Sequence, residues 1–337
     1  MQRLAVISNP NSQRNRQGAL DGLRAVLASH PGVLHGELWD FADLGAMIRR
    51  FLEDGVEIIA VNGGDGTVQA VLTELGRRDP DDGSPKLAVL AGGMTNVIAK
   101  DVGIDGKPDT ALEHLIRSLV DDEKNGGPPV EIVSRPLIGL ALHPDQPPVY
   151  GMFFGAAGFY QAVQLANDKV RRKGIAGSLA SASTLALSLF RLLFGRSGSD
   201  DRLYRGEPMV IGLDGVRRPE TSYLLLIATT LDRLILGLMP FWSDGRTIRD
   251  GRTAQDGGAI RYTSIDFPPQ RLFRALVPVL RGRPARWMRD RGYRSGSTGD
   301  MVIDIKSPVV LDGEIFHPDP AIPIRLTGDR SQTFVRC

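Results

Sequence analysis

The stretch Val61-Asn62-Gly63-Gly64-Asp65-Gly66-Thr67 decides the fold, because it joins an apolar strand to a helix through a glycine-rich turn. Residues 57–61 are typical of a buried strand, and the apolar spacing of residues 68–75 predicts a helix. Thr67 stands where a helix N-cap is expected, so backbone N–H groups and the positive end of the helix dipole would point into the turn. Such a turn attracts anions, and its glycines would let a phosphate chain approach the backbone. The pattern is typical of a phosphoryl-transfer site.

Asp65 is the one carboxylate at the centre of this turn. It would repel a bare phosphate, so its presence indicates either a bridging Mg²⁺ or a hydroxyl whose proton has to be removed. A plainer interpretation is a tight turn in which Asp65 is only a cap. The strand before the turn, the helix after it and a similar loop later in the chain favour the phosphate site.

Composition limits the class of protein. The chain has 337 residues, which is long for one hydrophobic core, so two domains are expected. A net charge of +2 argues against a strongly basic protein that binds nucleic acid through bulk charge. The single cysteine, Cys337, excludes an internal disulfide, and the N-terminus lacks the apolar segment of a signal peptide. We therefore expect a cytoplasmic protein that does not bind nucleic acid.

Residues 174–194 are nearly free of charge and about long enough to span a bilayer. The segment also contains several serines, a threonine and Arg191. A helix of a globular protein, or one that touches a membrane surface, is therefore favoured over a membrane span.

The N-terminal part alternates between strands and helices. The predicted strands are 4–8, 34–38, 57–61 and 87–90, and the predicted helices are 18–29, 43–54, 68–75 and 109–120. This alternation predicts a doubly wound α/β domain with a mostly parallel sheet, in which ligands bind at the carboxyl ends of the strands. Three polar loops should meet at that edge: 8–12, 62–67 and 91–96. A shared nucleotide pocket explains all three.

The polar, Gly- and Pro-rich segment 121–129 marks a break in this pattern. We therefore predict an N-terminal α/β domain over residues 1–130 and a second domain over 131–337. The second domain is expected to be a mostly antiparallel β-sandwich with helices at 174–194 and 270–280. Its predicted strands are 148–154, 209–213, 222–228, 259–265, 301–305 and 322–326.

Three motifs make the chain resemble the diacylglycerol-kinase-type lipid kinases, which include sphingosine and ceramide kinases and share a fold with NAD kinase. The run Asn9-Pro10-Asn11-Ser12 is similar to the family's Asn-Pro-x-Ser-Gly, and Gly63–Thr67 matches the family's Gly-Gly-Asp-Gly-Thr without a change. The segment 92–99 is similar to the third motif, Gly-Thr-x-Asn-(Asp or apolar)-x-Ala. The chain departs from the family at Gln13, Met94 and Val97.

The second domain resembles the family at three further places. Leu311-Asp312-Gly313-Glu314 is similar to an Asp-Gly-Glu element that contributes to the family's active site, although Asp-Gly is also a common hairpin turn. The segments 155–159 and 256–258 are less specific. Asp256 is implied to hold part of a structural cation site, although a hairpin turn is the commoner interpretation.

The resemblance implies an ATP- and Mg²⁺-dependent kinase that acts on a lipid hydroxyl. The Gly63–Thr67 loop would hold the phosphates, and Asp65 would work with Mg²⁺. Asp312 and Glu314 would accept the proton of the hydroxyl. The implied nucleotide-binding residues are Asn9, Pro10, Asn11, Ser12, Gly63, Gly64, Asp65, Gly66, Thr67, Gly93, Thr95 and Asn96.

Two stretches suggest contact with a membrane. Between 271 and 294 the chain has eight arginines and one acid, Asp290, among apolar residues that include Phe273 and Trp287. This composition is typical of a membrane-surface segment, although a solvated basic face is equally compatible. Residues 231–242 are unusually apolar for a loop, which fits either core packing or the rim of a lipid entrance.

Diacylglycerol is the expected acceptor, and a ceramide or sphingoid base is the close competitor. The motifs are also compatible with an NAD kinase and with a non-catalytic protein that binds a lipid or a nucleotide. We expect a cytoplasmic protein that associates peripherally with the membrane surface where its lipid lies. The sequence is compatible with a homodimer and does not fix the oligomeric state.

Overall fold

The structure is a computed structural model that describes residues 3–79, 83–93, 95–125, 130–164, 206–234, 237–242 and 258–337. The predicted helix at 174–194, Met94 and Asp256 lie outside the described residues. The chain divides into two compact units, one formed by Met1–Arg135 with Ser331–Cys337 and the other by Pro136–Arg330. We describe each unit by itself.

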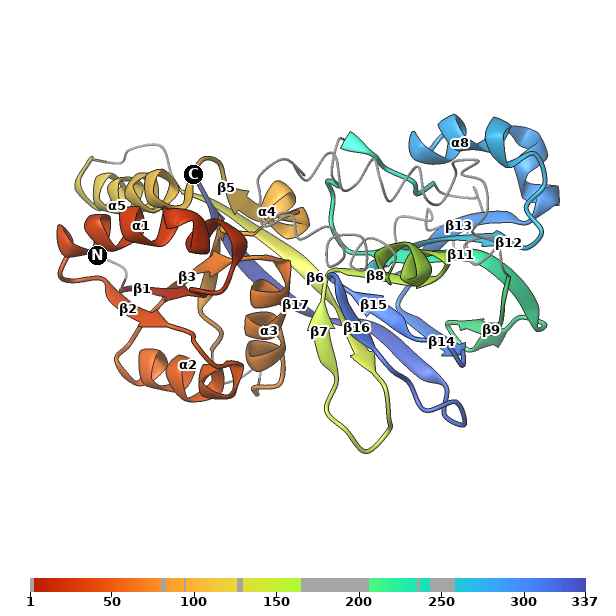
Figure 1. Cartoon of the computed structure of the whole chain (residues 1–337), viewed down its shortest axis with the longest axis horizontal. Helices are drawn as coiled ribbons and strands as arrows, with labels where there is room; N and C mark the ends of the chain where they lie inside the picture. The colour runs from red at the N-terminus through yellow and green to blue at the C-terminus, as the bar shows by residue number, and fades with distance from the viewer. Residues whose placement is uncertain are drawn as a thin grey trace. The chain divides into compact units, whose positions relative to one another are not determined.

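The first unit is built on a parallel sheet (Figure 1). β1 lies between β2 and β3, and β3 pairs in turn with β4, which also pairs with β5. All residues of β1 and β3 are buried, which agrees with their unbroken apolar sequence. The strands are β1 (Leu4–Ser8), β2 (Leu34–Glu37), β3 (Ile58–Gly63), β4 (Lys86–Ala91) and β5 (Gly103–Ile104).

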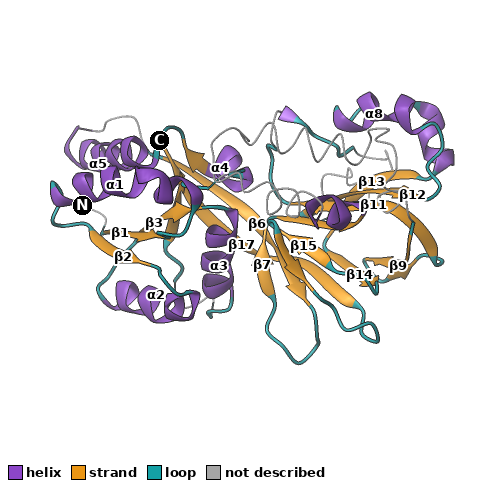
Figure 2. Cartoon of the chain, in the orientation of Figure 1, coloured by secondary structure: helices purple, strands orange, loops and turns teal. Residues whose placement is uncertain are grey.

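Helices cover both faces of this sheet, so the predicted doubly wound α/β fold is confirmed (Figure 2). α1 and α5 lie side by side, and their leucines share one core with Val6, Ala60 and Leu90 of the strands. α2 and α3 lie on the opposite face (Figure 1). The helices are α1 (Leu20–Ala28), α2 (Leu44–Glu53), α3 (Asp65–Gly76), α4 (Val97–Val102) and α5 (Pro108–Asn125), with short turns η1 (Asn15–Ala19) and η2 (Phe41–Asp43).

The C-terminal strand contributes to the first unit, which differs from the predicted division at residue 130. β17 (Ile324–Arg336) ends with Phe334 paired in parallel to Leu87, and Val335 is part of the core under α1 and α5. Ser331–Cys337 therefore belong to the unit that the sequence interpretation closed at 130. β6 (Glu131–Ala141) carries the chain from the first unit into the second.

The second unit consists of antiparallel strands, as the sequence predicts. One sheet contains β11 between β8 and β12, with β13 beside β12 and β15 beside β8. The other contains β14 between β9 and β17. The strands first named here are β7 (Val149–Gly151), β8 (Phe153–Ala157), β9 (Glu207–Leu213), β10 (Val216–Arg217), β11 (Thr221–Thr229), β12 (Ile260–Asp266), β13 (Tyr293–Thr298), β14 (Asp300–Asp304), β15 (Val309–Leu311) and β16 (Glu314–Phe316).

A buried core fills the space between these two sheets, so the unit is a β-sandwich. Leu226 and Ala228 of β11 face this core, whereas Leu225 and Ile227 of the same strand face a second apolar layer. That second layer is formed by α8 (Leu272–Leu280) and the turn η6 (Arg286–Arg291). Burial on both faces explains the continuous apolar sequence of β11.

The predicted helix at 270–280 is thus confirmed as α8. The apolar loop at 231–242 supplies Phe241 and Trp242 to the layer beneath that helix, so these two residues are core residues and not an exposed rim. Among the described residues, no helix combines the length and apolarity that crossing a membrane requires.

Candidate active site

The three predicted loops meet at the carboxyl end of the parallel sheet. The backbone N–H of Asn9, just after β1, donates to the carbonyl of Asn62 at the end of β3, at 2.9 Å. The amide Nδ2 of Asn9 donates to Oγ1 of Thr67 at 2.8 Å. The Oδ1 atom of Asn9 accepts the backbone N–H of Asn11 at 2.9 Å, which closes the first loop on itself. Asn9 therefore joins the loop after β1 to the loop after β3.

Thr67 does not cap α3, which corrects the position that the sequence suggested. The helix begins at Asp65, with Gly64 in an extended conformation as the N-cap residue. Thr67 lies in the first helical turn with its side chain buried, where it accepts the hydrogen bond from Asn9. The helix thus starts three residues earlier than it would with Thr67 as the cap, and its first turn directly follows Gly63 and Gly64.

Asp65 begins one helix, and its side chain contacts the start of another. It is the first residue of α3, and its Oδ1 atom accepts the backbone N–H of Ile98 in the first turn of α4 at 3.1 Å. Burial raises the pKa of the Asp65 carboxyl above its usual value, while the N–H groups of residues 96–98 act in the opposite direction. An ionised carboxylate at this place is therefore held by helix N-termini and gains from any further positive charge.

The third loop is fixed by Asn96, which adopts a left-handed conformation with a φ of 49°. Its Oδ1 atom accepts the backbone N–H of Gly93 at 2.9 Å, and its Nδ2 atom donates to the carbonyl of Gly93 at 2.8 Å. The two bonds form a ring that closes the turn before α4. Asn96 is 5% exposed, so its amide is used to shape the loop.

Several glycines of the two glycine loops are required by the contact between the loops. A Cβ atom on Gly93 would lie 2.4 Å from the Cα of Gly64, and one on Gly92 would lie 2.7 Å from Oδ1 of Asn62. A Cβ atom on Gly63 would lie 2.5 Å from Cβ of Thr67. The sequence predicts that the glycines at 63, 64 and 66 let a phosphate approach the backbone. In the structure Gly92 and Gly93 also let the two loops touch, and Gly63 leaves room for the side chain of Thr67.

The remaining predicted residues of the first unit lie on the same three loops. Pro10 and Ser12 are buried, Asn11 is exposed, and Gly66 and Thr95 are partly buried. The backbone N–H of Ser12 donates to the carbonyl of Asn9 at 3.1 Å. All predicted nucleotide-binding residues are thus brought together in one unit, and their role toward a nucleotide stays a prediction.

The sequence analysis gives no individual role to three residues of this site, of which Asn62 lies within a predicted loop and Arg14 and Asn15 do not. Asn15 donates through Nδ2 to the carbonyls of Asn9, at 2.7 Å, and Asn62, at 3.3 Å. Asn62 donates through Nδ2 to Oγ of Ser8 at 3.3 Å. Arg14 donates from its side chain to the carbonyl of Ala91 at 3.0 Å. Asn15 and Arg14 lie beyond the motif ending at Ser12, and only the run of polar residues after the first strand signals them.

These loops have hydrogen-bonding capacity left over. The buried atoms Oγ of Ser12, Oδ1 of Asn15 and Oδ1 of Asn62 have no hydrogen-bond partner within the described part of the chain. A buried polar atom left unpaired costs about 1–3 kcal/mol, so such atoms mark places where a ligand or its water molecules would be bound. The polar residues of the first unit therefore fit a nucleotide.

Asp312 and Glu314 lie in the second unit, on a two-residue hairpin between β15 and β16. Leu311 is paired with Glu314, and both Asp312 and Gly313 have positive φ angles, of 49° and 94°. This is the pattern of a type I′ turn, so the hairpin interpretation of Asp-Gly is correct as a description of the backbone. It does not exclude a chemical role for the carboxylates.

The two carboxylates of this hairpin differ in their surroundings. Asp312 is 8% exposed, and its Oδ2 and Oδ1 atoms accept the backbone N–H groups of Met152, at 2.9 Å, and Phe153, at 2.8 Å. Glu314 is exposed. Asp312 therefore ties the hairpin to the segment between β7 and β8, whereas Glu314 is the carboxylate with free access to a reactant.

No group of three histidine, cysteine, aspartate or glutamate side chains that could bind a metal by themselves occurs among the described residues. Mg²⁺ is commonly held by one or two carboxylates together with substrate phosphates and water. The carboxylate of Asp65, which lies in the glycine loop after β3, fits that mode of binding.

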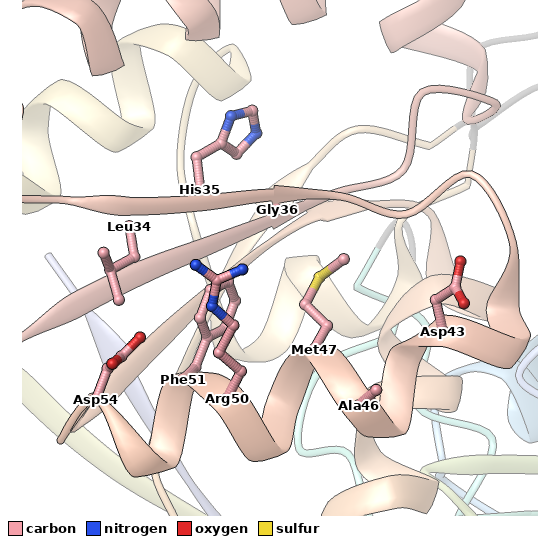
Figure 3. A pocket seen from close by; sticks show the side chains of 9 residues that line it. All are labelled: Leu34, His35, Gly36, Asp43, Ala46, Met47, Arg50, Phe51 and Asp54. Carbon is pink, nitrogen blue, oxygen red and sulfur yellow. The ribbon is translucent and has the colours of Figure 1, made fainter.

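A separate cavity of about 340 Å³ lies between β2 and α2 of the first unit (Figure 3). Its lining includes Leu34, Met47, Arg50 and Phe51, and Figure 3 shows these side chains between the strand and the helix. None of the predicted site residues lines this cavity. It is therefore distinct from the loop cluster at the carboxyl end of the sheet.

Comparison with known proteins agrees with the three motifs. Residues 3–123, which lie within the first unit, match the model of the diacylglycerol kinase catalytic domain. The chain is 34% identical over 75 residues to "Probable lipid kinase YegS-like" from Stenotrophomonas maltophilia (strain K279a). That match covers 22% of this chain and spans only 24% of the relative's length.

Solved structures extend the likeness of the fold. "A putative diacylglycerol kinase from Bacillus anthracis str. Sterne" has a TM-score of 0.66 and 14% identity, with 100% of this chain and 97% of that chain covered. A further structure of a diacylglycerol kinase from the same organism has a TM-score of 0.59 and 15% identity, with 99% and 96% covered. At this identity the likeness establishes a common fold.

Proposed function

We propose that this protein is an ATP- and Mg²⁺-dependent lipid kinase that phosphorylates a lipid hydroxyl, with diacylglycerol as the expected acceptor. The observation that carries the proposal is the meeting of three loops around Asp65 at the carboxyl end of the parallel sheet, within the region that matches a diacylglycerol kinase catalytic domain. The lipid acceptor is supported by the curated relative and by the three family motifs.

In this proposal the glycine loop holds the phosphates. The N–H groups of the first turn of α3 and the backbone from Gly63 to Thr67 bind the phosphate oxygens, as helix N-termini do. Asp65 takes part in holding Mg²⁺, and Ser12, Asn15 and Asn62 offer their unpaired polar atoms to the nucleotide and its water shell. When bound, ATP would supply the phosphoryl group and Mg²⁺ would neutralise the charge that develops on it.

The hairpin of the second unit supplies the carboxylates for the acceptor. Glu314 is the residue that takes the proton from the lipid hydroxyl, because it is exposed and its carboxylate can reach a reactant. Asp312 positions the hairpin through its bonds to the backbone N–H groups of Met152 and Phe153. The sequence analysis expects both residues to accept the proton, whereas here Glu314 accepts it and Asp312 positions the hairpin.

The acceptor is tested with radiolabelled ATP and a panel of diacylglycerol, ceramide, sphingosine, monoacylglycerol and NAD. Label in phosphatidic acid supports diacylglycerol, and label in another lipid keeps the kinase but changes the acceptor. Label in NAD alone would overturn the lipid assignment. Asp65→Asn should slow transfer of the label roughly 10²–10³-fold in every reaction, because it deletes the charge and keeps the shape of the side chain. A non-catalytic protein would bind ATP and transfer no label.

A lipid acceptor requires access to a membrane, so we also propose that the protein associates peripherally with membrane surfaces in the cytoplasm. This part of the proposal is supported by the arginine-rich segment between 271 and 294.

A further inference from the structure

α8 exposes apolar side chains on the side that faces away from the protein core. Its inner residues Leu272, Ala275 and Val279 are buried against the sandwich. On the outer side, Phe273 is 64% exposed and Val277 is 52% exposed. These two residues are four positions apart, so they lie one above the other on the helix. Large apolar residues are exposed on both of two successive turns.

Arginines flank these apolar residues. Arg274 lies on α8, and Arg281 directly follows the helix as its C-cap residue. Both are exposed, and they stand three and four positions from Val277, the spacing of neighbours on one side of a helix. No carboxylate forms an ion pair with either of them among the described residues. We call the four residues Phe273, Arg274, Val277 and Arg281 the outer surface of α8.

Other arginines of the segment are already engaged with neighbouring side chains. Arg294 forms an ion pair with Asp266 at 2.5 Å, and Arg271 lies over the ring of Trp287 at 5.9 Å. Arg283 and Arg286 are exposed in the turn that follows α8. The described part of the chain therefore has further exposed cationic charge directly after α8, and one exposed acid, Asp290, in the same segment.

We infer that the outer surface of α8 docks on an anionic lipid bilayer, with Phe273 and Val277 entering the interface and Arg274 and Arg281 bound to lipid phosphates. Charge complementarity selects this partner: exposed aromatic and aliphatic side chains beside arginines that have no ion pair in the described part of the chain match the apolar and anionic layers of a membrane surface. The inference rests on the membrane association proposed above and names the surface that makes the contact and the charge of the lipid that it requires.

The helix is held firmly enough to serve as a docking element. Its inner residues belong to a core that includes Trp242, Met288 and Tyr293. Tyr293 donates from its hydroxyl to the carbonyl of Gln270, at 2.8 Å, just before the helix. Substitution on the outer side therefore leaves the packing beneath the helix in place.

The test is flotation of the full chain with vesicles of phosphatidylcholine alone and vesicles that also contain phosphatidylglycerol. The wild type is expected to float only with the anionic vesicles, and Val277→Ala/Arg274→Gln is expected to bind them roughly fivefold or more weakly, the share of one arginine near an anionic surface. A matched control is Val216→Ala/Arg217→Gln, which changes the same residue types at an exposed place on β10. The control should bind as the wild type does.

Three results would overturn the inference. One is flotation that does not depend on phosphatidylglycerol, and another is equal loss in the control and the α8 variant. The third is sedimentation that reveals a dimer broken by Phe273→Ala, which would assign the surface to a second copy of the chain. Phosphorylation of a detergent-dispersed lipid is measured in parallel, so that failure of the kinase proposal is seen separately from failure of docking.

Discussion

The carboxylate of Asp65, at the start of α3, accepts the backbone N–H of Ile98, at the start of α4, at 3.1 Å. One side chain thus links the glycine loop after β3 to the third loop, which follows β4. The cap interpretation and the Mg²⁺ interpretation of Asp65 are compatible, because a carboxylate has about four lone-pair sites and can accept backbone N–H groups and bind a cation at the same time.

Asp65→Asn and Asp65→Ala separate these two roles. The asparagine keeps an oxygen for the Ile98 N–H and loses the charge, so we expect turnover to fall by roughly 10²–10³-fold with little change in stability. The alanine also removes the cap, which should lower the free energy of unfolding by about 1 kcal/mol. Urea denaturation and a kinase assay on both variants check this. Equal turnover in Asp65→Asn and wild type would contradict a role for the charge.

Gly93→Ala should separate the second and third loops. The new Cβ atom would lie 2.4 Å from the Cα of Gly64, so the backbone has to move, at a cost of about 1–3 kcal/mol. Nucleotide affinity, measured by calorimetry, should also fall, because the displaced loops carry the predicted nucleotide-binding residues. Gly32→Ala is the control, because a Cβ atom there has no neighbour within 4 Å. Similar stability for the two variants would show that the loops do not depend on their close contact.

The two carboxylates of the hairpin should respond differently. Glu314→Gln is expected to lower turnover by roughly 10²–10⁴-fold, the usual contribution of a general base, with stability almost unchanged. Asp312→Ala leaves the N–H groups of Met152 and Phe153 without their acceptor and should cost about 2 kcal/mol or more of stability. Turnover and urea denaturation on both variants test this division. A stable and inactive Asp312→Ala would instead assign chemistry to that residue.

His35 predicts a pH dependence of stability. Its Nε2 atom lies 3.0 Å from Oγ of Ser8, and burial lowers the pKa of the imidazole below its usual value near 6.5, with Glu37 acting in the opposite direction. The charged imidazole is thus disfavoured in the folded state. Stability from this group is present above pH 6.5 and decreases as the pH falls toward the folded-state pKa.

His35→Gln should therefore flatten the loss of stability between about pH 7.5 and about pH 5.5, where one histidine changes the free energy of unfolding by at most about 1.4 kcal/mol per pH unit. Urea denaturation at several pH values measures the slope. His114→Gln, which replaces an exposed histidine on α5, serves as the reference. An unchanged slope in His35→Gln would assign the pH dependence to other groups.

The parallel sheet and its three loops could be predicted from the sequence because each element carries a local signal. β1 and β3 are apolar runs that end in polar or glycine-rich turns, so type and position could be inferred. The six-residue helix α4 carries no amphipathic repeat long enough to detect, and the sequence interpretation left it out. That omission hid the partner of Asp65.

Contacts between distant segments were the least predictable part of the site. Nothing local indicates that Asn15 bridges the carbonyls of Asn9 and Asn62, or that Gly93 touches Gly64. The domain limit at 130 was drawn from a polar, proline-rich break, and such a signal cannot show that a strand near residue 334 pairs with Leu87. Pairing between remote strands depends on the whole chain.

The return of β17 has a consequence for how the molecule is made. Phe334 pairs with Leu87, and Val335 is buried in the core beneath α1 and α5. During synthesis, most residues of the first unit leave the ribosome before the second unit does. One strand of the first unit's sheet, however, emerges only after the second unit. The first unit must therefore stay incomplete, with an open strand edge and a gap in its core, while Pro136–Arg330 are translated.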